Sequence, residues 1–133
     1  IKTIDRAIDT DIVLQSSDTT EIADKWVIGL ASTRQIIHLS ASYKTQVDYT
    51  NSGDYTIAMQ YSYDDVTYTN LSSVNTVLVA PANDRQYNMT ANLDTKASVI
   101  FLRATYFHVG AAANNGTFNF QRWFVTIAVI PDI

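Results

Sequence analysis

Few residues in this chain could do nucleophilic or acid–base chemistry. It has two histidines, His38 and His108, and no cysteine. A serine–histidine–aspartate triad would need one of these imidazoles beside a hydroxyl nucleophile and a carboxylate. Neither histidine lies in a nucleophile-elbow motif, and both fall in predicted strands on the faces opposite the most apolar residues. We therefore expect surface histidines and a protein that is not an enzyme.

Carboxylates are the next candidates for catalysis. Twelve of the acidic residues are Asp, and the single Glu is Glu21. A glycosidase needs two carboxyl groups held about 5–9 Å apart, one of them with a raised pKa. Asp64 and Asp65 are neighbours, but they fall in a predicted turn, where both would stay solvated and ionised. The pair therefore indicates turn chemistry rather than hydrolysis.

Oxygen-bearing side chains in the turns could hold a calcium ion, which takes roughly six to eight oxygen ligands. Asp48, Asn51 and Asp54 surround a Ser-Gly turn, and Asn83 and Asp84 lie in another. The chain has no EF-hand spacing, and two histidines without a thiol disfavour zinc. We expect solvated turn residues and no cofactor or metal, with a structural calcium as the alternative.

Aromatic rings beside amides could bind a saccharide. A ring packs on the apolar face of a sugar, while amide, carboxylate and guanidinium groups bond its hydroxyls. The candidate ligand-binding residues are Tyr63, Asp64, Tyr68, Tyr106, His108, Asn114, Asn115, Arg122 and Trp123. Cross-strand packing is the competing interpretation for the aromatic residues. We expect Tyr55, Tyr61 and Trp26 in the core.

The overall composition narrows the function classes. Charged residues make up 17% of the chain and hydrophobic residues 47%, with a net charge of −4 and no basic stripe. A nucleic acid or an anionic membrane is disfavoured as a partner, because phosphate binding needs clustered cations. No apolar run approaches the ~18 residues needed for membrane insertion. The abundance of Asp, Thr, Asn, Ser and Tyr is typical of strands joined by polar turns.

Alternation of apolar and polar side chains predicts the strands. Between Asp54 and Tyr63, the apolar set Tyr55, Ile57, Met59, Tyr61 and Tyr63 occupies every second position. Asp64-Asp65 then supplies a turn, so residues 55–71 are predicted to form a β-hairpin. Residues 35–43 place Ile37, Leu39, Ala41 and Tyr43 on one face and Ile36, His38, Ser40 and Ser42 on the other.

The segment 98–109 is also a predicted strand. Its apolar face is expected to carry Val99, Phe101, Thr105, Phe107 and Val109. Arg103 interrupts this face, so we expect it near an edge or beside an acidic partner. Further strands are predicted around residues 26–30, 74–79, 86–90 and 118–130, the last ended by Pro131, which cannot donate to a ladder.

These elements predict an all-β fold: a two-sheet antiparallel β-sandwich, jelly-roll-like, of about eight strands. Residues 25–133 are expected to form the sandwich, and residues 1–24 a lead-in or linker that includes a first strand. Ile1, Ile4 and Ile8 share one helical face, which leaves two alternatives open, the end of a helix or an extended strand. Because the first residue is Ile rather than Met, we expect a piece of a larger protein.

A family resemblance lies in the hairpin. Residues 59–71, MQYSYDDVTYTNL, resemble the "QYS-x-D-G-x-x-W-x-x-L" hairpin of discoidin-like, galactose-binding-type sandwich domains and related carbohydrate-binding modules. Residues 98–104, SVIFLRA, resemble their later "RYVRL" strand. Asp65 stands where these domains usually have Gly, and their N-terminal disulfide is absent. The chain is also similar in character to accessory domains of phage tails and baseplates.

The resemblance implies a non-catalytic carbohydrate-binding module that recognises a cell-surface or cell-wall glycan, in phage host adhesion. Its partners would be a glycan and other subunits of a larger assembly, its location extracellular or virion-associated. Weak single sites would gain avidity from multivalent display, including as a homo-oligomer. The alternative is a structural or assembly domain of a virion or surface protein, which makes protein–protein contacts.

Overall fold

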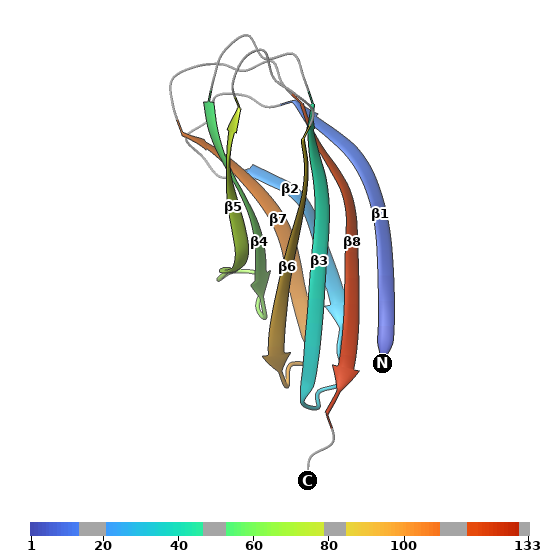
Figure 1. Ribbon diagram of the computed structural model, residues 1–133. Coiled ribbons are helices and arrows are strands. Elements are labelled where there is room, and N and C mark those ends of the chain that lie inside the picture. The colour runs from blue at the N-terminus through green and yellow to red at the C-terminus, as the bar shows by residue number, and fades with distance from the viewer. Residues whose placement is uncertain (14–20, 47–52, 79–84, 110–116, 131–133) are drawn as a thin grey trace.

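The computed structural model describes residues 1–13, 21–46, 53–78, 85–109 and 117–130. Eight strands account for nearly all of them (Figure 1): β1 (Lys2–Val13), β2 (Glu21–Gly29), β3 (Gln35–Gln46), β4 (Gly53–Ser62), β5 (Thr69–Leu78), β6 (Arg85–Thr95), β7 (Val99–Val109) and β8 (Thr117–Val129). Within these ranges no helix has the length and apolar character needed to cross a lipid bilayer. The predicted all-β fold is confirmed.

The strands form two antiparallel sheets of four, in the orders β1-β8-β3-β6 and β2-β7-β4-β5. Consecutive strands alternate between the sheets, except for β4 and β5, which pair as a hairpin. In Figure 1 the first sheet faces the viewer and the second lies behind it. This wrapping is a jelly roll, so each sheet combines strands that are far apart in the sequence.

The core lies between the two inner faces. On β3 the predicted inward set, Ile37, Leu39, Ala41 and Tyr43, is confirmed, because all four residues are buried. The other fully buried large side chains are Ile57, Met59, Ile100, Leu102, Phe120 and Trp123. They interdigitate as one cluster, which holds the sheets together through the removal of apolar surface from water.

The N-terminal residues form an edge strand of the sandwich. β1 pairs with β8 from Lys2 opposite Ile127 to Val13 opposite Thr117, and Ile4 and Ile8 pack against the core. The extended alternative for this segment is therefore correct, and residues 2–13 form the strand β1 at one edge of the first sheet. A bulge between Ala7 and Thr10 lets Asp9 adopt a φ of 49°.

The predicted hairpin is confirmed, and its strands pair from Gly53 opposite Leu78 to Tyr61 opposite Thr69, with one register shift between Met59 and Gln60. The return strand begins at Thr69, a few residues after the predicted turn at Asp64-Asp65. Asp65 has a φ of 61°. Gly most often supplies this left-handed conformation, and Asp is one of the few other residues that tolerate it. Asp65 therefore allows the same turn, although the resembling family has Gly at this position.

The predicted apolar face of β7 is wrong. The side chains that enter the core are Ile100, Leu102 and Ala104, whereas Phe101 and Arg103 belong to the alternate, outward row. The Arg103 guanidinium donates to Gln60 Oε1 at 2.7 Å and stacks 3.7 Å from the centroid of the Tyr68 ring. The pKa of the Asp65 carboxyl group is lowered mainly by a hydrogen bond from Lys25 and also by the charge of Arg103. An acidic residue is therefore among the neighbours of Arg103, as one of the two alternatives predicted, whereas β7 is not an edge strand. Both faces of this strand are apolar, so alternation alone could not choose the inner one.

Candidate functional site

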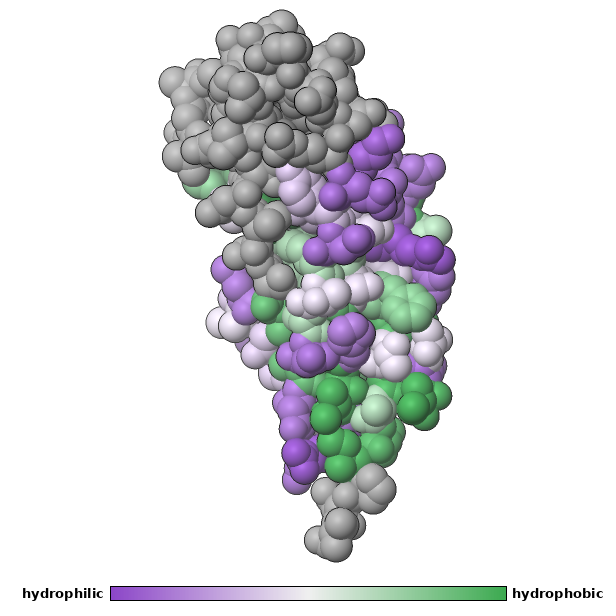
Figure 2. Space-filling view, in the orientation of Figure 1, coloured by the Kyte–Doolittle hydropathy of each residue, from purple (hydrophilic) through white to green (hydrophobic). Residues whose placement is uncertain are grey.

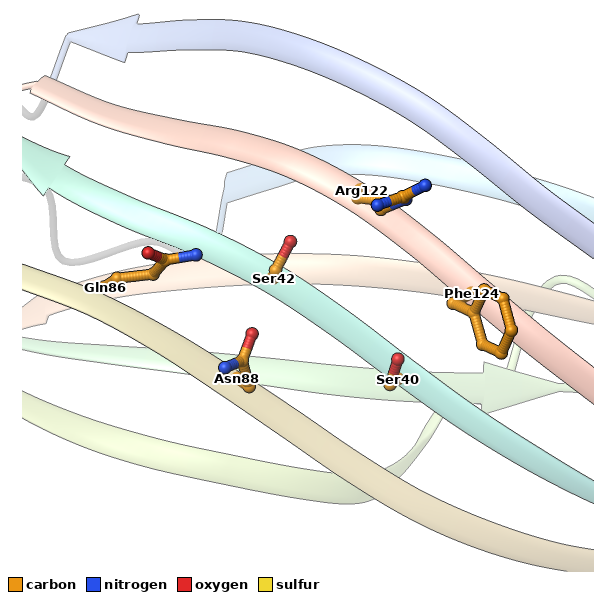
Figure 3. Close-up of a pocket in the computed structure, with 6 residues that line it drawn as sticks. All are labelled: Ser40, Ser42, Gln86, Asn88, Arg122 and Phe124. Carbon is orange, nitrogen blue, oxygen red and sulfur yellow. The ribbon is translucent and has the colours of Figure 1, made fainter.

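A shallow groove crosses the outer face of the sheet β1-β8-β3-β6. Its volume is about 420 Å³, and three neighbouring strands line it. β3 contributes Ser40 and Ser42, β6 contributes Gln86 and Asn88, and β8 contributes Arg122 and Phe124. Figure 3 shows all six side chains on one side of the sheet. We call these residues the sheet-face groove.

The strand period places these side chains outside. Because successive residues of a strand point to opposite faces, burial of Leu39 and Ala41 turns Ser40 and Ser42 outward. Trp123 and Val125 are buried on β8, and Phe124 between them is therefore outward and 37% exposed. Antiparallel register then aligns Ser42 with Arg122 on one side and with Asn88 on the other.

Arg122 is held in place by an acid from the neighbouring strand. Its Nε donates to Asp5 Oδ1 at 2.7 Å, and its Nη2 donates to the other carboxylate oxygen. This hydrogen-bonded pair lowers the pKa of Asp5 and raises that of Arg122. The carboxylate offsets the charge of the guanidinium, so the groove presents hydrogen-bond donors and acceptors with little net charge.

A second hollow of about 370 Å³ continues the groove toward the β1 bulge. It shares Ser42, Gln86 and Arg122 with the sheet-face groove and adds Ala7, Asp9 and Gln121. The Gln86 and Gln121 amides lie 3.4 Å apart. The combined surface is open and reaches from β6 across β3 and β8 to β1, a form that suits an extended ligand rather than an enclosed compact one.

The β1 bulge is stabilised by a buried amide. Asn119 Nδ2 donates to Asp9 Oδ1 at 3.1 Å and to Asp11 Oδ1 at 2.6 Å. Among the described residues, no group of three or more His, Cys, Asp or Glu side chains could hold a metal ion. Of the predicted calcium ligands, Asp48, Asn51, Asn83, Asp84 and the side chain of Asp54 lie outside the described residues.

The β4–β5 turn carries the other cluster that the sequence predicted. Tyr63, Asp64 and Tyr68 all lie within it. A hollow of about 340 Å³ runs beside it, lined by Tyr61, Ser62, Tyr63, Asp64, Thr67 and Thr69. Tyr63 is 44% exposed and makes an edge contact with Tyr61, which packs partly into the core as predicted.

Hydrogen bonds from the turn itself and from Lys25 on β2 already engage the two carboxylates of the turn. Asp64 Oδ1 accepts from the backbone N–H groups of Thr67 and Val66 and from the Ser62 hydroxyl. These donors lower the pKa of Asp64 to about 2. The Asp65 carboxylate accepts from Lys25 Nζ and from the Tyr68 hydroxyl. Asp64 therefore has a structural role in the turn.

The turn should weaken in acid. The pKa of Asp64 is lowered from 3.8 to about 2, so its contribution to stability is present above its ordinary pKa and is lost as pH falls toward 2. We expect the thermal midpoint of the wild type to fall over this window by more than that of Asp64→Ala. Calorimetry at a series of pH values measures the difference, and parallel curves would contradict this role for Asp64.

The remaining predicted residues are scattered. Arg122 lies in the sheet-face groove, whereas Tyr106 is half-buried and packs against the core. Trp26, which was expected in the core, is half-buried there too, under the Arg6 guanidinium. Asn114, Asn115 and the side chain of His108 lie outside the described residues. His38 is exposed on the outer face, with Nδ1 2.7 Å from Asn92 Oδ1, which confirms a surface histidine.

The assignment of Trp123 to the ligand-binding residues does not fit the structure. The side chain is 0% exposed, packs 5.2 Å from the Phe120 ring and donates its Nε1–H to Asp24 Oδ2 at 2.8 Å. A fully buried ring cannot present its face to a sugar. The ring that faces solvent belongs to the next residue, Phe124, because the strand period reverses the face at each step.

Sequence reasoning missed five groove residues: Ser40, Ser42, Gln86, Asn88 and Phe124. The first two were predicted to face away from the core, but the signal that they form a site is the register with β6 and β8. That register joins residues some 45 to 80 positions apart, such as Ser42 with Asn88 and Arg122. Single-strand alternation does not contain this information.

No family model matches this sequence, and a search of curated proteins finds no match. Among solved structures, the infectious bursal disease virus Gx strain matches with a TM-score of 0.60 and 14% identity over 96% of this chain. VP2 protein of that virus in T=1 particles matches with a TM-score of 0.57 and 10% identity, also over 96%. This chain spans about a third, 32%, of each of those chains. At such identities the likeness shows the fold alone.

A structure titled as a CBM4 study also matches, over 80% of this chain and 59% of its own, at 16% identity. Its TM-score is 0.41. The two virus-protein matches agree with the jelly-roll β-sandwich that the strand order shows.

Proposed function

We propose that this domain is a non-catalytic saccharide-binding module and that the sheet-face groove is its binding site. The observation that carries the proposal is one half-exposed ring, Phe124, on the same sheet face as a row of hydroxyl, amide and guanidinium groups. Saccharides need this mixture, because their rings have apolar faces and hydroxyl rims.

Each part of the groove has a defined task in this proposal. The Phe124 ring packs against the apolar face of a sugar, while the amides of Gln86 and Asn88 bond hydroxyls on the other side. Arg122 offers guanidinium donors from a position fixed by Asp5. Because Asp5 offsets this cation, a neutral saccharide fits the groove better than an anionic one. None of the six groove side chains is a carboxylate or an imidazole, so the groove supports binding rather than hydrolysis.

The open form of the groove and its continuation toward Gln121 favour an extended glycan chain, such as those on cell surfaces and cell walls. A rigid sheet presents the groups with little loss of conformational entropy on binding. Single-site affinity on such an open surface is weak, and multivalent display on a virion, a phage tail or another assembly would raise it. Weak but multivalent binding of glycan chains is suited to adhesion to a host surface.

The test is a titration of the wild-type protein with a panel of neutral and acidic oligosaccharides. Isothermal titration calorimetry identifies a ligand, and amide chemical shifts locate it. We expect a neutral ligand whose shifts cluster on Ser40, Ser42 and Asn88. Shifts confined to the β4–β5 turn, residues 62–69, would move the site to the hairpin, and silence across the panel would reject saccharide binding.

An assembly domain is the second candidate, and an apolar end of the sandwich favours it. A hollow of about 380 Å³ there is lined mainly by apolar residues, including Ile1, Leu30, Ile127 and Val129. Val129 is 55% exposed. Figure 2 shows the hydrophobic surface gathered at this end, below a more polar sheet face. Self-association that Val129→Ser abolishes, in a protein silent toward saccharides, would favour this function.

A further inference from the structure

Among the residues that the structure describes, β6 has a paired strand on one side only, so its other side is a sheet edge. It is the last strand of its sheet and pairs with β3 from Gln35 opposite Thr95 to Thr45 opposite Arg85 without any register shift. In the described pairings of the other three terminal strands, β1, β2 and β5, a shift interrupts the ladder. Bulges are one way in which proteins protect an edge from pairing with another strand, and Lys and Pro are others. β6 contains none of these.

The sequence of β6 is complementary to itself when it is reversed about Thr90. In an antiparallel pair centred there, Thr90 faces its own copy and Asn88 faces Asn92. Gln86 then faces Asp94. On the inward row, Tyr87 faces Leu93 and Met89 faces Ala91. Between Gln86 and Asp94, each residue thus meets one of its own character, polar outside and apolar inside, as stable cross-strand pairs require. The end pair, Arg85 and Thr95, is polar.

The partial exposure of inward side chains on β6 agrees with an edge that another strand could cover. Of the inward residues, Met89 is buried, whereas Tyr87, Ala91 and Leu93 pack against the core but remain half-buried. A second strand on this edge would cover them. Charge presents no obstacle, since the one charged residue between Gln86 and Asp94 is Asp94 itself. Arg34 binds it at 2.9 Å, and the residue opposite would be a neutral amide.

We propose that two copies of this chain associate through β6, paired antiparallel about Thr90, so that their sheets join into one continuous sheet. A second copy is the partner that fits, because a two-fold axis makes every contact occur twice with exchanged roles. A strand of another protein would not need β6 to match its own reversed sequence. This inference does not depend on the saccharide-binding function, although it would place two sheet-face grooves on one surface.

Replacement of Thr90 tests the pairing directly, because its side chain is exposed in the single chain and would meet its own copy on the axis. We expect a wild-type dimer in sedimentation velocity. Thr90→Lys and Thr90→Asp should each raise the dimer dissociation constant roughly tenfold, since like charges would lie directly opposite. An equal mixture of the two variants should restore dimers. Thr3→Lys, at an exposed site on the other edge strand β1, is the matched control and should dimerise as the wild type does.

Cross-linking tests the register. Residues directly opposite in an antiparallel pair have Cα atoms roughly 4.5–5.5 Å apart, within the range that a disulfide spans. The chain has no cysteine, so Thr90→Cys should give a covalent dimer on oxidation, whereas Thr3→Cys should not. A monomeric wild type at every accessible concentration would overturn the proposal. So would a dimer that neither Thr90→Lys nor Thr90→Asp weakens, or equal cross-linking at both positions.

Discussion

Replacement of Trp123 with alanine is expected to lower the free energy of unfolding by about 3–5 kcal/mol, the range for truncation of a buried aromatic residue. Domains of this kind are stable by only about 5–15 kcal/mol, so the change removes a large part of the total. The reason is burial: the indole is fully enclosed and packs against Phe120 between the two sheets. Alanine would leave a cavity that the strands cannot close without breaking their ladders.

The indole nitrogen adds a polar contribution. Its N–H bonds Asp24, which also contacts Arg6 at 3.4 Å, so Trp123 links β8 to β2 across the edge of the sandwich. Trp123→Phe separates the two contributions because it keeps most of the ring and removes the donor. Its expected cost is about 1–3 kcal/mol, the penalty for a part-buried acceptor that loses a partner.

Urea denaturation followed by the fluorescence of the remaining tryptophan, Trp26, measures both variants. The matched control is Phe124→Ala in the next position. Its side chain faces outward, so its loss should cost about 1 kcal/mol or less. Equal destabilisation by Trp123→Ala and Phe124→Ala would mean that the described packing of β8 is wrong.

For saccharide binding, the largest effect is expected from Phe124 rather than from Trp123. Phe124→Ala should weaken the saccharide affinity by about tenfold, because the ring supplies about 1–2 kcal/mol of apolar contact with the sugar face. The variant should keep the wild-type circular dichroism spectrum and nearly the wild-type unfolding curve, since its neighbours Trp123 and Val125 fill the core. Calorimetric titration with the ligand found in the panel gives the ratio of dissociation constants.

Tyr63→Ala is the matched control for this measurement. Tyr63 is the most exposed ring of the hairpin cluster, and its exposed fraction, 44%, is close to the 37% of Phe124. It lies beside a different hollow, on the β4–β5 turn. Wild-type affinity in Tyr63→Ala together with weakened affinity in Phe124→Ala assigns binding to the sheet face. The opposite result would assign it to the hairpin and reject the sheet-face groove.

The sequence alone determined the fold class and the clearest strands. On β3 only one face is apolar, so Ile37 and Leu39 could be placed inside before any neighbour was known. The hairpin followed from alternation interrupted by Asp64-Asp65. In each case the information is local, because a strand with one apolar face has one stable orientation and a turn needs only the few residues within it.

Where both faces are apolar, local pattern could not choose between them. β7 offers apolar side chains on both rows, and the inward row is decided by the strands that pack above it. Local pattern also could not choose between Trp123 and Phe124 in the apolar tract of β8. Trp123 enters the core, and Phe124 faces solvent. At the N-terminus, the spacing of Ile4 and Ile8 is compatible with a helix or a strand, and the pairing of this segment with β8 makes it a strand.

Only the tertiary structure decided the sheet-face groove and the free edge beside it. Arg122, Ser42 and Asn88 form one row because β8 and β6 pair with opposite sides of β3. A jelly roll brings together strands that are distant in the sequence, and their register is fixed by closure of the whole core. Alternation along the chain decides which side chains face outward. Which of them become neighbours depends on the energy of packing two complete sheets.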